Sequence, residues 1–130
     1  MDRDVVVEVA TKMIPKLQLL FVFGSQADGT AHSDSDLDLA FKSADKLSSL
    51  ERYDIAQDIA ASLNIDVDLV DLDNCGAVLA NEVAMKGQLL KGDDAAADYF
   101  FVQAMREYQD HKARVRSIED DLLMSLRGKS

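Results

Sequence analysis

The spacing of apolar residues changes several times along this chain, and each change predicts a boundary between two secondary-structure elements. Residues 4–16 carry apolar side chains at about helical spacing, which predicts a first helix. Residues 17–23 form an apolar run that Gly24 closes, which is typical of a buried strand rather than of a short helix. A loop rich in turn-forming residues is then predicted at 25–35, and a second strand at 37–41.

The rest of the chain predicts a third strand among helices. Apolar residues at helical spacing predict an amphipathic helix over 47–63, and alternating apolar and acidic residues predict a strand over 65–72. A short helix is predicted at 77–85, with a turn or a short edge strand at 87–92. From residue 93 to about 126 no Pro or Gly interrupts the sequence, so one long helix is expected.

Together these elements predict an α/β (α+β) fold, in which a small mixed sheet is packed by helices and followed by a long C-terminal helix. A chain of 130 residues can build one compact core but hardly two. We therefore expect a single domain over 1–130, with 93–127 as a C-terminal helical extension. The charged middle of that helix, 106–116, predicts a stretch that is solvated or that contacts another chain.

The formal net charge of −10 argues against broad non-specific binding of nucleic acid, because phosphate neutralisation needs clustered Lys and Arg. A basic partner fits this charge better. The single cysteine, Cys75, excludes an internal disulfide, and no apolar run approaches the roughly 20 residues of a membrane span. The expected location is therefore the cytoplasm, without membrane contact.

Candidate chemistry concentrates in the stretch where Gly24-Ser25 is followed, after ten residues, by Asp36-Leu37-Asp38. Side chains two residues apart on a strand leave the same face, so the carboxylates of Asp36 and Asp38 project together and repel each other. Divalent cations would relieve this repulsion, and magnesium prefers oxygen ligands completed by water and phosphates. The pair therefore predicts a magnesium site.

The Gly-Ser step supplies what a nucleoside triphosphate needs. Gly24 lets the backbone approach a phosphate closely, and Ser25 adds a hydroxyl and exposed N–H groups. A third carboxylate would come from the strand at 65–72, where Asp66 and Asp68 share one face. If the two acidic strands are neighbours, Asp68 completes a two-metal phosphoryl-transfer site. Asp66 is as readily a solvent-facing strand residue as an auxiliary group.

In this order, the residues resemble the nucleotidyltransferases of the DNA polymerase beta superfamily. They are most similar to the minimal nucleotidyltransferase (MNT) group, which includes the antitoxins of HEPN/MNT toxin–antitoxin pairs. The family pattern is Gly-Ser, a spacer, Asp-x-Asp, and then an Asp on a later strand in a Val-Asp-Leu-Val context. The resemblance covers about residues 17–72 and falls on Gly24, Ser25, Asp36, Asp38 and Asp68.

The resemblance implies a magnesium-dependent nucleotidyltransferase with ATP as its substrate. Asp36, Asp38 and Asp68 are then the catalytic residues and the ligands of two magnesium ions, and Gly24 and Ser25 bind the nucleotide. Some antitoxins of this group adenylylate a tyrosine of their HEPN toxin and so silence its RNase activity. We therefore expect a protein adenylyltransferase antitoxin that forms an oligomer with a cognate HEPN-type toxin.

One position departs from the family pattern. Many relatives read Gly-Ser-x-Ala-Arg-Gly, whereas this chain has Asp28 where the family often places an Arg that faces phosphate. An acid at this position argues against phosphate binding by residue 28 and would lower the affinity for a triphosphate. His32, in the same loop, is expected to be a solvated surface residue.

Other interpretations of the same residues are weaker. The alternating acids around residue 36 begin like a calcium-binding loop, but Leu39 stands where that loop requires Gly and Asp45 where it requires a bidentate Glu. Arg106 and His111 have the spacing of the RNase motif of HEPN domains, which raises the rival idea that this chain is the toxin. HEPN domains are all-helical, whereas half of this chain is predicted to contain strands among its helices.

Two rival functions stay open at this point. A catalytically silent antitoxin would block its partner by contact alone, and its complex would survive the loss of Asp36 and Asp38. A nucleotidyltransferase that acts on RNA or on a small molecule would transfer its label to that acceptor rather than to a protein.

Overall fold

The computed structural model describes residues 2–24 and 36–128. Along the chain, the helices and strands are α1 (Arg3–Met13), β1 (Leu17–Phe23), β2 (Leu37–Ser43), α3 (Ser49–Leu63), β3 (Val67–Asp71), α4 (Ala77–Lys86), β4 (Gln88–Lys91) and α5 (Asp94–Arg127). Every helix and strand that the apolar spacing predicts is present, and the stretch at 87–92 contains the short strand β4. The predicted α+β class is thereby confirmed, while the predicted loop at 25–35 lies outside the described residues.

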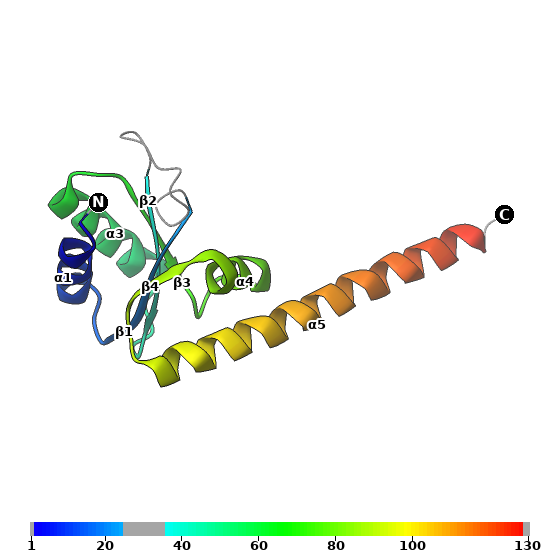
Figure 1. Cartoon of the computed structure of the whole chain (residues 1–130). Helices are drawn as coiled ribbons and strands as arrows, with labels where there is room; N and C mark the ends of the chain where they lie inside the picture. Colours follow the sequence, from blue (N-terminus) through cyan, green and yellow to red (C-terminus); the bar gives the residue numbers. More distant parts are fainter. Residues whose placement is uncertain (1, 25–35, 129–130) are drawn as a thin grey trace.

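The strands form a four-stranded mixed sheet in the order β3-β2-β1-β4 (Figure 1). β1 pairs antiparallel with both β2 and β4, and β2 pairs parallel with β3. Within the described residues, β3 and β4 are therefore the two edges of the sheet. The sheet also excludes the rival interpretation of Arg106 and His111 as the motif of an all-helical HEPN domain.

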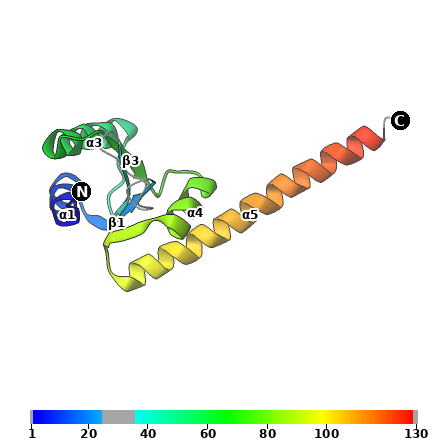
Figure 2. The same ribbon diagram turned by 45° about the horizontal axis from the view of Figure 1, so that its top comes forward.

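Helices cover both faces of the sheet, so the fold has three layers (Figure 2). α1 and α3 pack on one face, against strand residues that include Leu20, Leu39 and Leu69. α4 and the first turns of α5 pack on the other face, against Phe21 and Ala40. β1 is buried on both faces, which explains why its sequence is an apolar run rather than an alternation.

Local sequence signals set the ends of two helices. α1 ends at Met13, earlier than the predicted residue 16. The proline ring at position 15 clashes with the residue before it, and that residue therefore avoids helical backbone angles. Ile14, which precedes Pro15, is accordingly extended. α3 begins with a capping box, in which the Ser48 hydroxyl accepts the Glu51 N–H and the Glu51 carboxylate accepts the Ser48 N–H.

The helix α5 contains 34 residues in two kinds of surroundings. In its first turns Ala97, Phe100 and Ala104 are buried, and the rings of Phe100 and Phe21 pack with centroids 5.2 Å apart. From Lys112 on, every described residue is exposed, and this projecting part of α5 leads away from the sheet (Figure 1). It carries the exposed apolar residues Val115, Ile118, Leu122, Leu123, Met124 and Leu126. No helix of the described residues has the length and apolar character that crossing a membrane requires.

This division of α5 predicts different outcomes for two truncations. A chain that ends at Lys112 should keep the melting temperature of the full chain, because it loses only exposed residues. A chain that ends at Tyr99 should fail to fold, because it loses Phe100 and Ala104 from the core. In the full chain, Phe100→Ala should lower the free energy of unfolding by about 3–5 kcal/mol. The matched control Ile118→Ala should change it by less than about 0.5 kcal/mol.

Thermal unfolding followed by circular dichroism measures all four variants. Equal destabilisation by the two truncations would show that the projecting part of α5 belongs to the folded core.

Candidate active site

The ends of adjacent strands bring the predicted acidic residues together. In the parallel pair of β2 and β3, Asp38 and Asp68 are register partners, so their side chains leave the same face of the sheet as neighbours. Asp36 comes one residue before β2, at the same end of the sheet, and is exposed. Asp66 lies just before β3, and its carbonyl oxygen accepts a hydrogen bond of 2.8 Å from the N–H of Leu37. The condition set for Asp68, that the two acidic strands are neighbours, is therefore met.

Gly24 follows β1 and lies directly beside Asp38. Its φ of +66° falls in the left-handed region, and a Cβ at this position would lie 2.3 Å from Oδ2 of Asp38. Only glycine fits there without displacing the carboxylate. The predicted nucleotide-binding glycine therefore adjoins the acidic cluster, while Ser25, Asp28 and His32 lie outside the described residues.

Burial, together with repulsion within the cluster, raises the pKa of Asp38 above its ordinary value of 3.8. Partial burial is the largest cause, because it removes water from the charged form. The negative charges of Asp68, Asp36 and Glu82 raise the pKa further, in that order. Ionised Asp38 is therefore disfavoured in the folded chain, and a bound cation would relieve this cost.

Glu82 is an acid that the sequence pattern did not predict for this site. It lies on α4, which packs on the sheet face that carries Ala40 and Val70, two residues beyond Asp38 and Asp68 on the same strands. An exposed glutamate within a helix carries no motif of its own. Only the packing of α4 against the sheet brings its charge toward Asp38.

The donor atoms of the cluster fit a hard divalent cation, because all of them are carboxylate oxygens. Among the described residues, no three Asp, Glu, His or Cys side chains are already close enough to hold a metal ion. Magnesium does not need such a cage, since it usually takes one or two carboxylates and completes its shell with water and substrate phosphates. The carboxylates of Asp36, Asp38 and Asp68 therefore fit magnesium that binds together with a triphosphate.

The chain is similar to known proteins in both sequence and structure. Residues 6–96 match the family described as polymerase beta, nucleotidyltransferase. The protein adenylyltransferase MntA of Shewanella oneidensis strain MR-1 is 35% identical over 130 residues, which cover 100% of this chain and 94% of MntA.

Solved structures of toxin–antitoxin complexes match almost the whole chain. A crystal structure of a toxin–antitoxin with AMP-PNP matches with a TM-score of 0.87 and 36% identity, over 95% of this chain and 99% of that chain. The tri-AMPylated HEPN toxin of Shewanella oneidensis in complex with its MNT antitoxin matches with a TM-score of 0.79 and 34% identity, over 93% and 95%.

The raised pKa of Asp38 predicts that Asp38→Asn stabilises the protein when no metal is bound. The folded state binds the Asp38 proton more tightly than the unfolded state, so the ionised carboxylate lowers stability above the raised pKa. The melting temperature of the variant should exceed that of wild type slightly at pH 7.5 in chelator. The difference should disappear as the pH falls through the raised pKa towards 3.8.

Asp54→Asn, which removes an exposed acid from α3, is the matched control for the loss of one surface carboxylate. Magnesium with a triphosphate should then stabilise wild type more than Asp38→Asn. A variant that is less stable than wild type at every pH would contradict the repulsion.

A second prediction concerns the contact between Gly24 and Asp38. Gly24→Ala should weaken magnesium-dependent binding of AMP-PNP by roughly tenfold or more. The added methyl group pushes the Asp38 carboxylate away from the position in which it would hold magnesium, and a contact of this charged kind is worth about 1.5–3 kcal/mol. Gly76→Ala is the control, because a Cβ added at that glycine meets no atom within 4 Å. Calorimetric titration measures both, and equal affinities would show that the close approach at Gly24 is not needed.

Proposed function

This chain belongs to the polymerase beta nucleotidyltransferase family, and from that premise we propose that it is a protein adenylyltransferase antitoxin. It transfers AMP from ATP to a tyrosine hydroxyl of a cognate HEPN-type toxin and so neutralises that toxin. The parallel register that sets Asp38 beside Asp68, with Gly24 against the same carboxylate, is the observation that carries the proposal. The similarity to MntA and to the toxin–antitoxin complexes supports the choice of acceptor.

Each residue of the site has a separate role in the proposed reaction. Gly24 leaves room for the phosphates of ATP at the end of β1, and Ser25 is the expected hydrogen-bond donor to them. Asp36, Asp38 and Asp68 would hold magnesium, which supplies positive charge against the phosphate oxygens and favours ionisation of the acceptor hydroxyl. The tyrosine oxygen attacks the alpha phosphorus, the bond to pyrophosphate breaks, and the hydroxyl proton passes to water on the side of Asp68.

Charge favours a protein acceptor over free RNA. The net charge of −10 opposes the approach of a polyanion, whereas a basic partner is attracted and oriented by it. The projecting part of α5 supports a protein partner as well, because six of its large apolar side chains are exposed. ATP as substrate and the single cysteine fit a protein that works in the cytoplasm.

The proposal predicts that radioactive label from alpha-labelled ATP moves to the toxin. Purified chain, magnesium, labelled ATP and the cognate toxin should give labelled tyrosine and a toxin with reduced RNase activity. Asp36→Asn and Asp38→Asn should lower the labelling rate by at least roughly 100-fold. Each removes a carboxylate that would hold magnesium, and with it the positive charge that stabilises the transition state. Asp54→Asn, an exposed acid on α3, should label the toxin at the wild-type rate.

The rival functions give different results in the same assay. A toxin that stays unlabelled but is inhibited equally by wild type and by Asp36→Asn would support an antitoxin that acts by binding alone. Label in added RNA or in a small molecule, and none in the toxin, would support a nucleotidyltransferase with another acceptor.

A further inference from the structure

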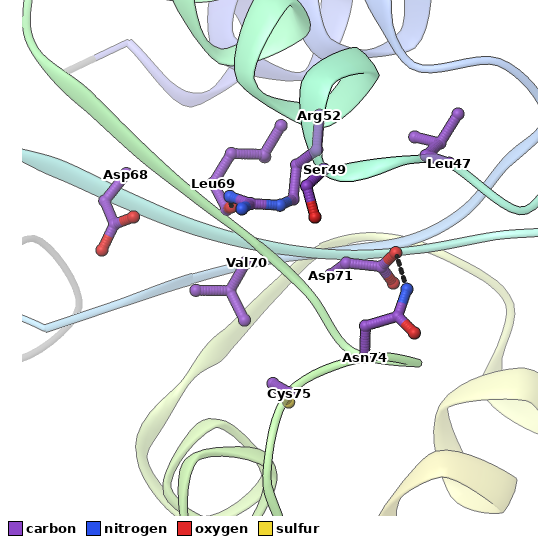
Figure 3. Close-up of a pocket in the computed structure, with 9 residues that line it drawn as sticks. All are labelled: Leu47, Ser49, Arg52, Asp68, Leu69, Val70, Asp71, Asn74 and Cys75. Atoms are coloured by element: carbon purple, nitrogen blue, oxygen red, sulfur yellow. Dashed lines mark hydrogen bonds between the residues drawn. The ribbon is translucent and has the colours of Figure 1, made fainter.

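A cavity of about 300 Å³ lies along the outer edge of β3, next to the proposed catalytic residue Asp68 (Figure 3). Asp68 stands at one end of the cavity and Asn74 towards the other, with Arg52 of α3 above the strand between them. The site described above uses only Asp68 from this set. The remaining polar groups of the cavity have no role in that site so far.

The strand order decides which substrate can reach this cavity. Gly24, directly after β1, adjoins Asp38 on β2, and Asp38 adjoins Asp68 on β3, so the three residues form a row across the sheet. In phosphoryl transfer the attacking and leaving oxygens lie roughly in line on opposite sides of the phosphorus. If pyrophosphate leaves on the side of Gly24, the acceptor arrives on the side of Asp68, where the cavity opens.

Arg52 is the cation of this cavity. Its Nη1 donates a hydrogen bond of 2.9 Å to the carbonyl oxygen of Leu69, which is an edge carbonyl of β3. No described carboxylate lies within 4.0 Å of the guanidinium, although this side chain is only partly exposed. A guanidinium has five N–H donors, so one bond leaves further donors for a ligand. These donors can bind a carbonyl, carboxylate or phosphate oxygen.

The far wall of the cavity is a fixed turn. The Asp71 carboxylate accepts hydrogen bonds from the Asp73 N–H at 3.0 Å and from the Asn74 side-chain amide at 2.8 Å. The N–H groups of Asn74 and Cys75 both donate to the Asp71 carbonyl. This wall does not need a ligand to form, so the cavity is ready to position an incoming group.

We propose that this cavity binds the segment of the partner protein that carries the acceptor tyrosine, and that Arg52 holds a carbonyl or carboxylate oxygen of that segment. The tyrosine hydroxyl then lies at Asp68. This inference rests on the proposed function and adds an acceptor-binding residue to it. The volume is at the lower end for ligand pockets, about 300–1,000 Å³, which suits a short peptide segment better than a whole nucleotide. Because Arg52 already occupies the Leu69 carbonyl, the segment does not extend the sheet as a regular strand.

The test compares steady-state AMP transfer to the cognate toxin by wild type, Arg52→Met, Arg52→Lys and Ser49→Phe. Arg52→Met should raise KM for the toxin roughly tenfold or more, the effect of losing one charge-assisted hydrogen bond, and leave KM for ATP unchanged. Arg52→Lys, which keeps one charged donor, should recover part of the loss. Ser49→Phe fills the cavity but leaves the hydrogen bond from Arg52 to Leu69 in place. A raised KM for the toxin in this variant would therefore come from blocking the cavity and not from destabilising the edge of β3. Lys46→Met removes an exposed cation outside the cavity and should behave like wild type.

The outcomes separate this inference from the function on which it rests. A wild-type KM for the toxin in both Arg52→Met and Ser49→Phe would overturn the acceptor site, while labelling by wild type would leave the proposed function standing. A raised KM for ATP with an unchanged KM for the toxin would also overturn it, since the cavity would then hold the nucleotide. If wild type labels no toxin at all, both the function and this inference fail.

Discussion

The register between β2 and β3 is the constraint on which the rest of the site depends. It is fixed by apolar packing, because Leu37, Leu39 and Leu69 are almost completely buried on the opposite face from the carboxylates. A slip of one residue would turn these side chains to the other face of the sheet. The core therefore holds Asp38 and Asp68 side by side although their charges repel each other. The raised pKa of Asp38 is the local cost of this arrangement, and burial of the leucines offsets it.

The same strand order separates the two substrates of the reaction. The central strand β1 is buried on both faces, so only its end at Gly24 is free to meet a ligand. The edge strand β3, in contrast, has a side that no other described strand covers. A nucleotide that enters over Gly24 and an acceptor that enters along β3 approach the carboxylates from opposite sides. In-line transfer requires attack and departure on opposite sides of the phosphorus, and the edge position of β3 leaves one side open for the acceptor.

The spacing of apolar residues was enough to predict the helices and strands. It failed only where a single residue sets the end of an element or where a contact between distant residues sets a position. The apolar run at 17–23 gave the limits of β1 correctly, whereas the end of the first helix depended on Pro15. The motif predicted Gly24, Asp36 and Asp38 from spacing that is local in the sequence. Asp68 lies beside Asp38 only because β2 pairs with β3, and the local sequence could give that pairing only as a condition. Glu82 and Arg52 carry no motif, since their positions depend on how α4 and α3 pack on the sheet.

A domain this small has little surface beside its active site with which to hold a protein acceptor. The first turns of α5 are held in the core by Phe100, so they provide a nucleus from which the projecting part continues as a helix. Every described residue of that part is exposed, and burying its apolar side chains on a partner would contribute about 25 cal/mol for each Å² removed from water. Affinity can therefore come from the projecting part of α5, far from the chemistry, while the cavity at β3 orients the hydroxyl. Binding energy that is gained at a distance from the reacting atoms is what allows a short acceptor segment to be held in line with a phosphate.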